Sequence, residues 1–207
     1  MVIRMHNGIF IAGEGIDGAG KSTHMKLLAD RLEQKGHEVV RLREPTDGGW
    51  GQKIRKLLVE GRGGISPETE LEWFINDRRE DVEQNIRPAL ERGAVVVIDR
   101  YYYSTAAYQG ALGFDPGTII RDNELFAPRP DLVLLFCIDP EEGLKRISSS
   151  RDGFSSFEKL DYLKRVQANF DSFKGSHIQR INADRPKEAV AEDVLLKVSG
   201  LIEQRSC

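Results

Sequence analysis

Short apolar runs alternate with amphipathic stretches along the 207-residue chain. Five of these runs are short and largely apolar, which is typical of strands buried on both faces of a sheet. The predicted strands are residues 8–12, 38–42, 94–98, 132–138 and, more weakly, 178–181. The predicted helices are residues 51–60, 67–92, 104–111, 140–149, 157–173 and 187–204. This order predicts an α/β fold, a three-layer α-β-α sandwich with a central five-stranded parallel sheet.

One glycine-rich segment carries the strongest chemical signal. Gly15, Gly20, Lys21 and Ser22 satisfy the pattern G-x-x-x-x-G-K-[ST], the phosphate-binding loop of P-loop NTPases. The segment follows the first apolar run and precedes a helical pattern that ends at Gly36. A strand, a glycine turn and a helix together direct backbone N–H groups and the positive end of a helix dipole at an anion. The residues expected to bind the phosphates of ATP are Gly15, Ile16, Asp17, Gly18, Ala19, Gly20, Lys21, Ser22 and Thr23.

The same motif predicts a site for a divalent cation. Lys21 is expected to reach the β- and γ-phosphates, and the Ser22 hydroxyl to ligate Mg²⁺. Asp99 directly follows the third apolar run, at the carboxyl edge where ligands of open α/β sheets bind. An aspartate there can hold Mg²⁺ directly or through water, or it can cap the next helix. Arg100 beside it could bind a phosphate in a bidentate manner.

Charge and composition exclude some function classes. The 30 Lys and Arg residues against 33 Asp and Glu give a net charge of −3, which argues against binding a nucleic-acid backbone. No apolar stretch approaches the roughly 18 residues of a membrane span, and the N-terminus lacks a signal-peptide core. We therefore expect a cytoplasmic protein without a membrane partner. Cys137 and Cys207 show no metal-binding spacing.

A single segment has a linker-like composition. Residues 148–156 read Ser-Ser-Ser-Arg-Asp-Gly-Phe-Ser-Ser, and serine and glycine imply flexibility. The segment is either a surface loop or a lid that closes over phosphates. With no internal repeat or domain boundary elsewhere, residues 1–207 are expected to form one P-loop domain with a lid at about 147–158.

Several further segments, taken in order, resemble the thymidylate (dTMP) kinase family of P-loop nucleoside monophosphate kinases. Residues 99–110, Asp-Arg-Tyr-Tyr-Tyr-Ser-Thr-Ala-Ala-Tyr-Gln-Gly, resemble its DRY…S…AYQG segment. The turn Arg43-Glu44-Pro45 is similar to its REP turn, and Phe74 to Arg78 resembles its F-x-x-x-R helix. Residues 86–90, 130–132 and 139–142 also follow its pattern, so the resemblance spans residues 8 to about 190.

The resemblance implies phosphorylation of dTMP to dTDP by Mg-ATP through direct in-line phosphoryl transfer, in dTTP synthesis. It implies that Phe74 stacks on thymine and that Arg78 donates to the thymine O4. Arg43 and Arg100 would hold the acceptor phosphate, and Tyr108 would crowd the sugar 2′ position. The other residues that it places at the substrate are Asp17, near the 3′-hydroxyl, and Glu44, Ser104 and Gln109.

The family has two arrangements of its catalytic arginine, one in the phosphate loop and one in the lid. The loop position here is Gly18, so the resemblance implies the lid arrangement, with Arg151 as the catalytic arginine. Arg146 precedes the lid and is expected near the adenine or its phosphates. A homodimer is implied by the resemblance alone.

Two departures from the family pattern leave alternatives open. Residues 46–50 replace the usual glycine pair, and Trp50 makes the turn similar to that of deoxynucleoside kinases, where the glutamate is a general base. Tyr102 and Tyr103 are bulky, and either pack or narrow the acceptor pocket. The alternatives are another deoxynucleoside monophosphate, a deoxynucleoside with Glu44 as the base, or a nucleotide-dependent switch protein. The two arginines at the acceptor site favour a monophosphate, because a neutral nucleoside does not require that much positive charge.

Overall fold

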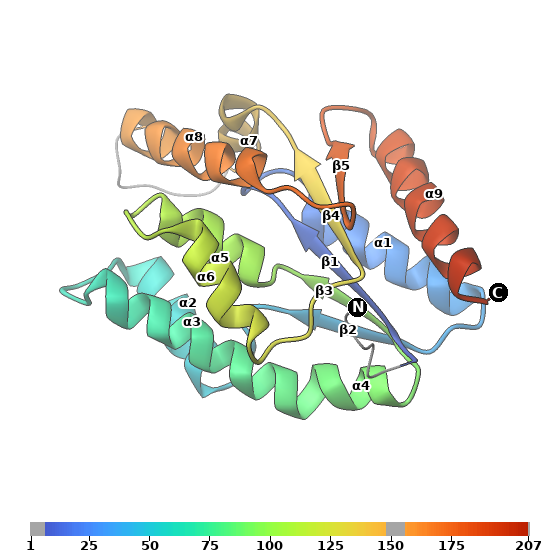
Figure 1. The fold of residues 1–207 in the computed structure, drawn as a ribbon. Coiled ribbons are helices and arrows are strands. Elements are labelled where there is room, and N and C mark those ends of the chain that lie inside the picture. The colour runs from blue at the N-terminus through green and yellow to red at the C-terminus, as the bar shows by residue number, and fades with distance from the viewer. Residues whose placement is uncertain (1–6, 148–155, 207) are drawn as a thin grey trace.

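The computed structural model describes residues 7–147 and 156–206, and its centre is a parallel sheet of five strands (Figure 1). The strands are β1 (Ile9–Glu14), β2 (Val39–Arg43), β3 (Val95–Asp99), β4 (Leu132–Cys137) and β5 (Ile178–Asn182). They lie in the order β2-β3-β1-β4-β5, and all neighbours are parallel. The predicted strands and fold class are confirmed, with boundaries that differ by one or two residues.

Helices cover both faces of the sheet (Figure 1). The helices on one face are α1 (Lys21–Gln34) and α9 (Lys187–Ser206). The helices on the other face are α3 (Pro67–Asp81), α4 (Arg87–Glu91), α5 (Tyr102–Gly110), α6 (Pro116–Glu124) and α8 (Ser156–Ser172). Helix α2 (Gly49–Glu60) packs against α3, and α7 (Pro140–Ile147) packs against α8. None of the helices in the described part of the chain is long and apolar enough to cross a membrane.

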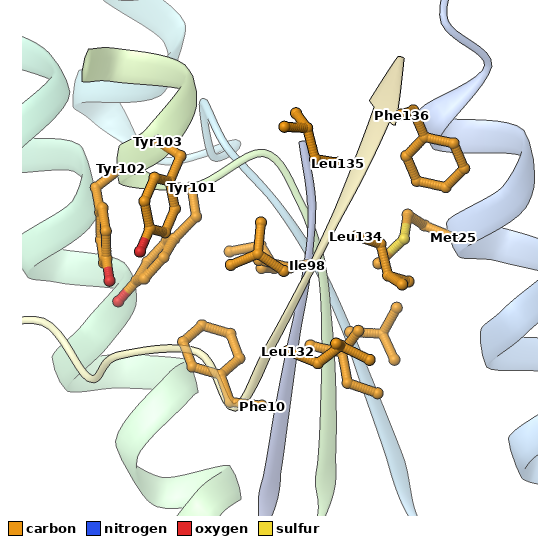
Figure 2. Close-up of a cluster of buried hydrophobic side chains, with 14 of the residues drawn as sticks. Phe10, Met25, Ile98, Tyr101, Tyr102, Tyr103, Leu132, Leu134, Leu135 and Phe136 are labelled. Carbon is orange, nitrogen blue, oxygen red and sulfur yellow. The ribbon is translucent and has the colours of Figure 1, made fainter. Parts of the chain in front are cut away.

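Tyr102 and Tyr103 belong to the hydrophobic core. Figure 2 shows them with Tyr101 on the α5 side of the sheet, opposite Met25 on the α1 side. Both side chains are buried, and their ring centroids lie 4.6 Å apart. Their hydroxyls find polar partners, Glu124 at 3.1 Å for Tyr102 and His177 at 2.8 Å for Tyr103. Of the two alternatives left open for these rings, the structure therefore supports packing.

The helix predicted over residues 67–92 is interrupted. Helix α3 ends at Asp81, a π-helical turn follows at Val82–Ile86, and α4 begins at Arg87. Pro88 in the first turn of α4 cannot donate a hydrogen bond, and its ring displaces the carbonyl four residues earlier. The backbone hydrogen bonds change accordingly from the α-helical to the π-helical pattern, since the Arg87 N–H bonds to the Val82 carbonyl, five residues back.

Helix α6 was not predicted, although its start carries a sequence signal. The Asp115 carboxylate accepts from the Thr118 N–H at 2.7 Å, and Pro116 occupies the first turn. Aspartate at the cap followed by proline favours a helix start. Gly117 in the first turn weakens the helical pattern and explains the omission. Residues 148–155, most of the predicted lid, lie outside the described residues, so the lid stays a prediction.

Candidate active site

The glycine loop between β1 and α1 takes a shape that only glycine allows. Gly15, Gly18 and Gly20 have φ angles of 135°, 81° and 80°, in the left-handed region. A Cβ atom on Gly15 would overlap the Phe136 carbonyl oxygen, and one on Gly18 would overlap the Gly143 carbonyl oxygen. The loop is therefore pressed against the end of β4 and against α7, and position 18 has no room for a side chain.

Lys21 lies in the first turn of α1, inside this loop. Its ammonium donates to the Ile16 carbonyl at 2.7 Å. Burial and, secondarily, the positive charge of Arg100 lower the pKa of Lys21 to about 7. Because a neighbouring anion favours the charged form of an amine, a phosphate in the loop would restore the charge of Lys21.

Ser22 and Asp99 meet at the carboxyl edge of the sheet. The Ser22 hydroxyl donates to Asp99 Oδ2, while Asp99 Oδ1 is buried and has no hydrogen-bond partner among the described residues. A hydroxyl and a carboxylate with a free oxygen are donors that suit Mg²⁺, which completes its shell with water and substrate phosphates. No group of three or more His, Cys, Asp and Glu side chains in the described ranges could hold a metal by itself. The residues present thus fit a cation that arrives with a nucleotide.

Arg100 is the centre of a polar network that joins the glycine loop to α5. Its guanidinium forms an ion pair with Asp17 and donates to the Ser104 hydroxyl at 3.0 Å. The guanidinium also lies over the Tyr108 ring, 5.1 Å from its centroid, and the Tyr108 hydroxyl donates to Asp17 at 2.9 Å. Burial raises the pKa of Asp17, but the charges of Arg100 and Lys21 outweigh it and hold the pKa below its usual value. The structure therefore brings together Asp17, Arg100, Ser104 and Tyr108.

Glu14 supports this network and was missed from the sequence. It is fully buried at the end of β1, and it accepts from the Tyr101 N–H at 2.9 Å and from the Ser104 hydroxyl. These bonds hold the turn in which Arg100 takes a left-handed φ of 71°. Burial raises the pKa of Glu14 to about 7. A glutamate inside an otherwise apolar strand was the available signal, because a buried carboxylate needs partners.

Phe74 and Arg78 stand one turn apart on α3, as predicted. Phe74 is half-buried and does not belong to the core cluster of the described residues. Arg78 is 1% exposed, and its guanidinium donates to Glu44, to Thr105 at 2.9 Å and to Asn123 at 2.8 Å. Neither Thr105 nor Asn123 was singled out from the sequence.

Glu44 faces Arg78 across this buried site. Burial raises the pKa of the Glu44 carboxyl to about 8, against the opposing attraction of Arg78. One carboxyl oxygen accepts from Arg78, so Glu44 is an ion-pair partner of α3. Gln109 lies apart from this pair, since its amide donates to Glu70 at 2.9 Å.

The turn after Glu44 is held by two helices. Asp77 of α3 accepts from the Thr46 N–H at 2.8 Å and from the Thr46 hydroxyl at 2.6 Å. Arg55 of α2 donates to the Thr46 carbonyl at 2.6 Å and to the Pro45 carbonyl at 2.5 Å. Side chains of α2 and α3 thus hold the turn at Thr46, where the family pattern has a glycine pair. Trp50 lies on α2 with the Lys53 ammonium 4.1 Å from its ring centroid.

Three further arginines were predicted at the site from the sequence. Arg43 is exposed at the end of β2, where its register partner is Asp99. Arg146 of α7 reaches the loop after β5, 3.4 Å from both the Ala183 carbonyl and the Asp184 carboxylate. Arg151 lies outside the described residues, so its assignment stays a prediction.

Comparisons with known proteins give a consistent result over most of the chain. A family model described as "Thymidylate kinase" matches residues 14–194. A protein named "Thymidylate kinase" from Desulfotalea psychrophila is 47% identical over 197 residues, which cover 95% of this chain and 96% of that protein. A "Probable thymidylate kinase" from Archaeoglobus fulgidus is 45% identical over 186 residues, 90% of this chain and 92% of that protein. A "Thymidylate kinase" from Akkermansia muciniphila is 46% identical over 187 residues, 90% and 89% of the two chains.

Proposed function

The chain belongs to the thymidylate kinase family, and from this premise we propose which of its residues carry out the phosphorylation of dTMP to dTDP. The enzyme is a nucleoside monophosphate kinase, with ATP as the phosphoryl donor. The observation that carries the residue assignment is the Arg100 network, because the partly buried guanidinium bonds both to Asp17 of the glycine loop and to the Tyr108 hydroxyl of α5. A phosphoryl group passing from a donor in the loop to an acceptor at α5 would cross this point.

The donor side is formed by the loop and the first turn of α1. Backbone N–H groups of the loop bind the β- and γ-phosphates of ATP, and Lys21 stabilises the charge that develops on the transferred group. Ser22 and the free oxygen of Asp99 would hold Mg²⁺, which would neutralise negative charge on the phosphates. Arg146, beside the loop after β5, lies where the adenine is expected.

The acceptor side needs charge neutralisation more than a general base. The second pKa of a phosphate monoester is about 6, so the attacking oxygen of dTMP is already ionised near neutral pH. Arg43 and Arg100 hold that phosphate, and positioning then supplies most of the catalysis. Glu44 is bound by Arg78, which supports a monophosphate acceptor over a nucleoside that would require Glu44 as a base.

The nucleoside of dTMP lies between α3 and α5. Phe74 stacks on the thymine, and Arg78 donates to its O4, a carbonyl in thymine and an amino group in cytosine. Tyr108 crowds the 2′ position, and Asp17 lies near the 3′-hydroxyl. Ser104 holds Arg100, and Gln109 closes the far side of the pocket through Glu70.

A panel of acceptors tests these assignments. Coupled ADP release is measured with Mg-ATP and dTMP, dUMP, dCMP, dGMP, UMP, thymidine or no acceptor. We expect a strong preference for dTMP over dCMP and no turnover without acceptor. Preference for thymidine would make Glu44 a general base, and turnover without acceptor would indicate a nucleotide-dependent switch.

Two further assignments extend the proposal beyond the described residues and beyond one chain. Arg151 supplies the catalytic cation from a lid at about 147–158, because position 18 of the loop holds no side chain. The enzyme is a homodimer, as the family resemblance implies, and the exposed Leu58 and Val59 of α2 are available for such a contact. Sedimentation equilibrium at micromolar concentration distinguishes the dimer from a monomer.

A further inference from the structure

Asn123 lies behind Arg78, on the helix α6 that the sequence pattern did not predict. Its side chain is 0% exposed, and its Oδ1 accepts from Arg78 Nη1 at 2.8 Å. Its Nδ2 donates to the Ile119 carbonyl at 2.8 Å, one turn earlier in the same helix. Because one end of the amide accepts and the other donates, a single orientation satisfies both bonds.

The donors of Arg78 are shared among three elements. Nη2 donates to Glu44, which follows β2, and to Thr105 of α5, while Nη1 donates to Asn123 of α6. Nε is buried and has no hydrogen-bond partner among the described residues. A buried donor without an acceptor costs free energy, and in a native structure it calls for an explanation. The protein thus holds both outer nitrogens of Arg78 and leaves the Nε–H for another acceptor.

We propose that Asn123 is a positioning residue for thymine selectivity, which fixes the guanidinium plane of Arg78 so that the Nε–H meets the O4 carbonyl of the base. The inference rests on the proposed role of Arg78 in binding thymine. In this arrangement thymine supplies an acceptor for the one guanidinium nitrogen that has no partner among the described residues.

The amide suits this task better than a carboxylate would. Glu44 already accepts from Arg78, and a second carboxyl group would add another acid that is costly to ionise in this dry site. A neutral acceptor holds Nη1 without that cost. Helix α6 also packs against α5, which carries Thr105, so the amide ties Arg78 of α3 to the helix pair of α5 and α6.

Selectivity between thymine and cytosine is the property that this arrangement controls. A fixed N–H opposite the cytosine amino group leaves two donors unpaired, whereas opposite O4 it forms a hydrogen bond. A guanidinium that is free to rotate would avoid the unfavourable contact with the cytosine amino group and would also bind thymine less well. The ratio of kcat/KM for dTMP to kcat/KM for dCMP therefore reports on Asn123.

Two substitutions of Asn123 separate the effect of the hydrogen-bond acceptor from the effect of packing. Asn123→Leu removes the acceptor at similar volume and should lower the dTMP/dCMP ratio about 10-fold, mainly through the KM for dTMP, with the KM for ATP unchanged. Asn123→Asp keeps an acceptor for Nη1 and should retain more of the ratio than Asn123→Leu, while the lost bond to Ile119 and the second carboxyl beside Glu44 lower the melting temperature. A wild-type ratio in Asn123→Leu, together with a lower melting temperature, would reduce Asn123 to a structural role and overturn the inference.

Asn169→Ala is the matched control. Asn169 of α8 donates to the Ala107 carbonyl of α5 at 2.9 Å, so its truncation also removes an amide bond to that helix region. Among the described residues Asn169 makes no hydrogen bond to Arg78, and we expect the dTMP/dCMP ratio to stay at its wild-type value. An equal loss of the ratio in this control would show that general loosening of α5 is sufficient, and would contradict a role through Arg78.

Arg78→Ala distinguishes failure of the inference from failure of the proposed function. We expect Arg78→Ala to lower the ratio, and the double variant with Asn123→Leu to lower it no further, because both act through one guanidinium. An unchanged ratio in Arg78→Ala would mean that the base is bound elsewhere, and both proposals would fall. A lowered ratio in Arg78→Ala with a wild-type ratio in Asn123→Leu would overturn the inference about Asn123 alone.

Discussion

At the scale of single residues, the site is a set of buried charges whose pKa values depend on one another. Lys21 is buried and Arg100 is partly buried, and burial together with the charge of Arg100 lowers the pKa of Lys21 to about 7. Asp17 between them is held ionised by both. Such a site binds an anion strongly, because the phosphate relieves the repulsion between two cations.

Lys21→Ala tests the most central of these residues. Because the loop lysine bears on the charge of the transition state, we expect kcat to fall by a factor on the order of 10³. Single-turnover measurement at saturating ATP and dTMP gives the rate of the chemical step. Substitution of Lys26, exposed one turn later on α1, by alanine is the control and should leave kcat unchanged. A wild-type rate in Lys21→Ala would refute the assignment of the loop.

Arg151→Ala tests the predicted lid arginine. If Arg151 stabilises charge on the transferred phosphoryl group, kcat should fall by a factor on the order of 10³ with little change in the KM for dTMP. Steady-state kinetics with both substrates varied provides the measurement. The exposed Lys145 of α7 offers a matched cation, and Lys145→Ala should retain wild-type kcat. Equal effects of the two substitutions would indicate a general loss of positive charge at the lid.

At the scale of elements, the glycine loop and α7 form one packed unit. A Cβ on Gly18 would overlap the Gly143 backbone of α7, so the loop can keep its shape only while α7 keeps its position. Helix α7 leads directly toward the predicted lid. The same contact therefore relates the position of the glycine loop to that of the helix that precedes the predicted lid.

Gly18→Ala tests this contact, with Gly36→Ala as its control. Both glycines have positive φ, 81° and 87°, so both substitutions carry backbone strain of roughly 1 kcal/mol. A Cβ on Gly36 meets nothing within 4 Å. Gly18→Ala should therefore lower the urea midpoint further than Gly36→Ala and should also raise the KM for ATP. Equal midpoints and a wild-type KM in both variants would contradict the tight packing of the loop against α7.

Individual elements show which parts of the fold and of the site the sequence predicts. The β1 run, the glycine loop and the α1 pattern agree with one another, so strand, loop and first helix were all predicted. Asn123 could not be identified, because its role depends on α6 meeting α3, a contact between distant segments without a local pattern. Glu44 was expected at the acceptor, and only the three-dimensional structure shows its carboxylate turned toward Arg78. Periodicity predicts elements well, but the partner of a buried polar group depends on tertiary packing.

At the scale of the whole molecule, the carboxyl edge of the parallel sheet gathers the ionisable groups. Glu14, Asp99 and Arg43 stand at or near the ends of three adjacent strands. Burial there raises the pKa of Glu14 to about 7 from 4.5. The folded protein thus binds a proton at Glu14 more tightly than the unfolded chain, and this gives its stability a pH dependence.

Glu14→Gln measures that dependence. A raised carboxyl pKa favours the folded state at low pH, and this contribution is lost as the pH rises from about 4.5 through about 7. Between pH 5 and 8 we expect Glu14 to account for a loss of about 2 to 3 kcal/mol in the free energy of unfolding. Urea unfolding at both pH values should show a smaller fall in Glu14→Gln than in the wild-type protein. The exposed Glu60→Gln serves as control, and an equal fall in all three proteins would contradict the prediction.

The closed space at Gly18 also limits how this enzyme can evolve. A catalytic arginine in the glycine loop, as other members of the family are expected to have, is not one substitution away, because the Gly143 backbone fills the volume that its Cβ would need. A lineage starting from this chain would first have to shift α7, and the intermediate would lose loop geometry before gaining a cation. Position 18 is therefore restricted to glycine for as long as α7 keeps its place against the loop.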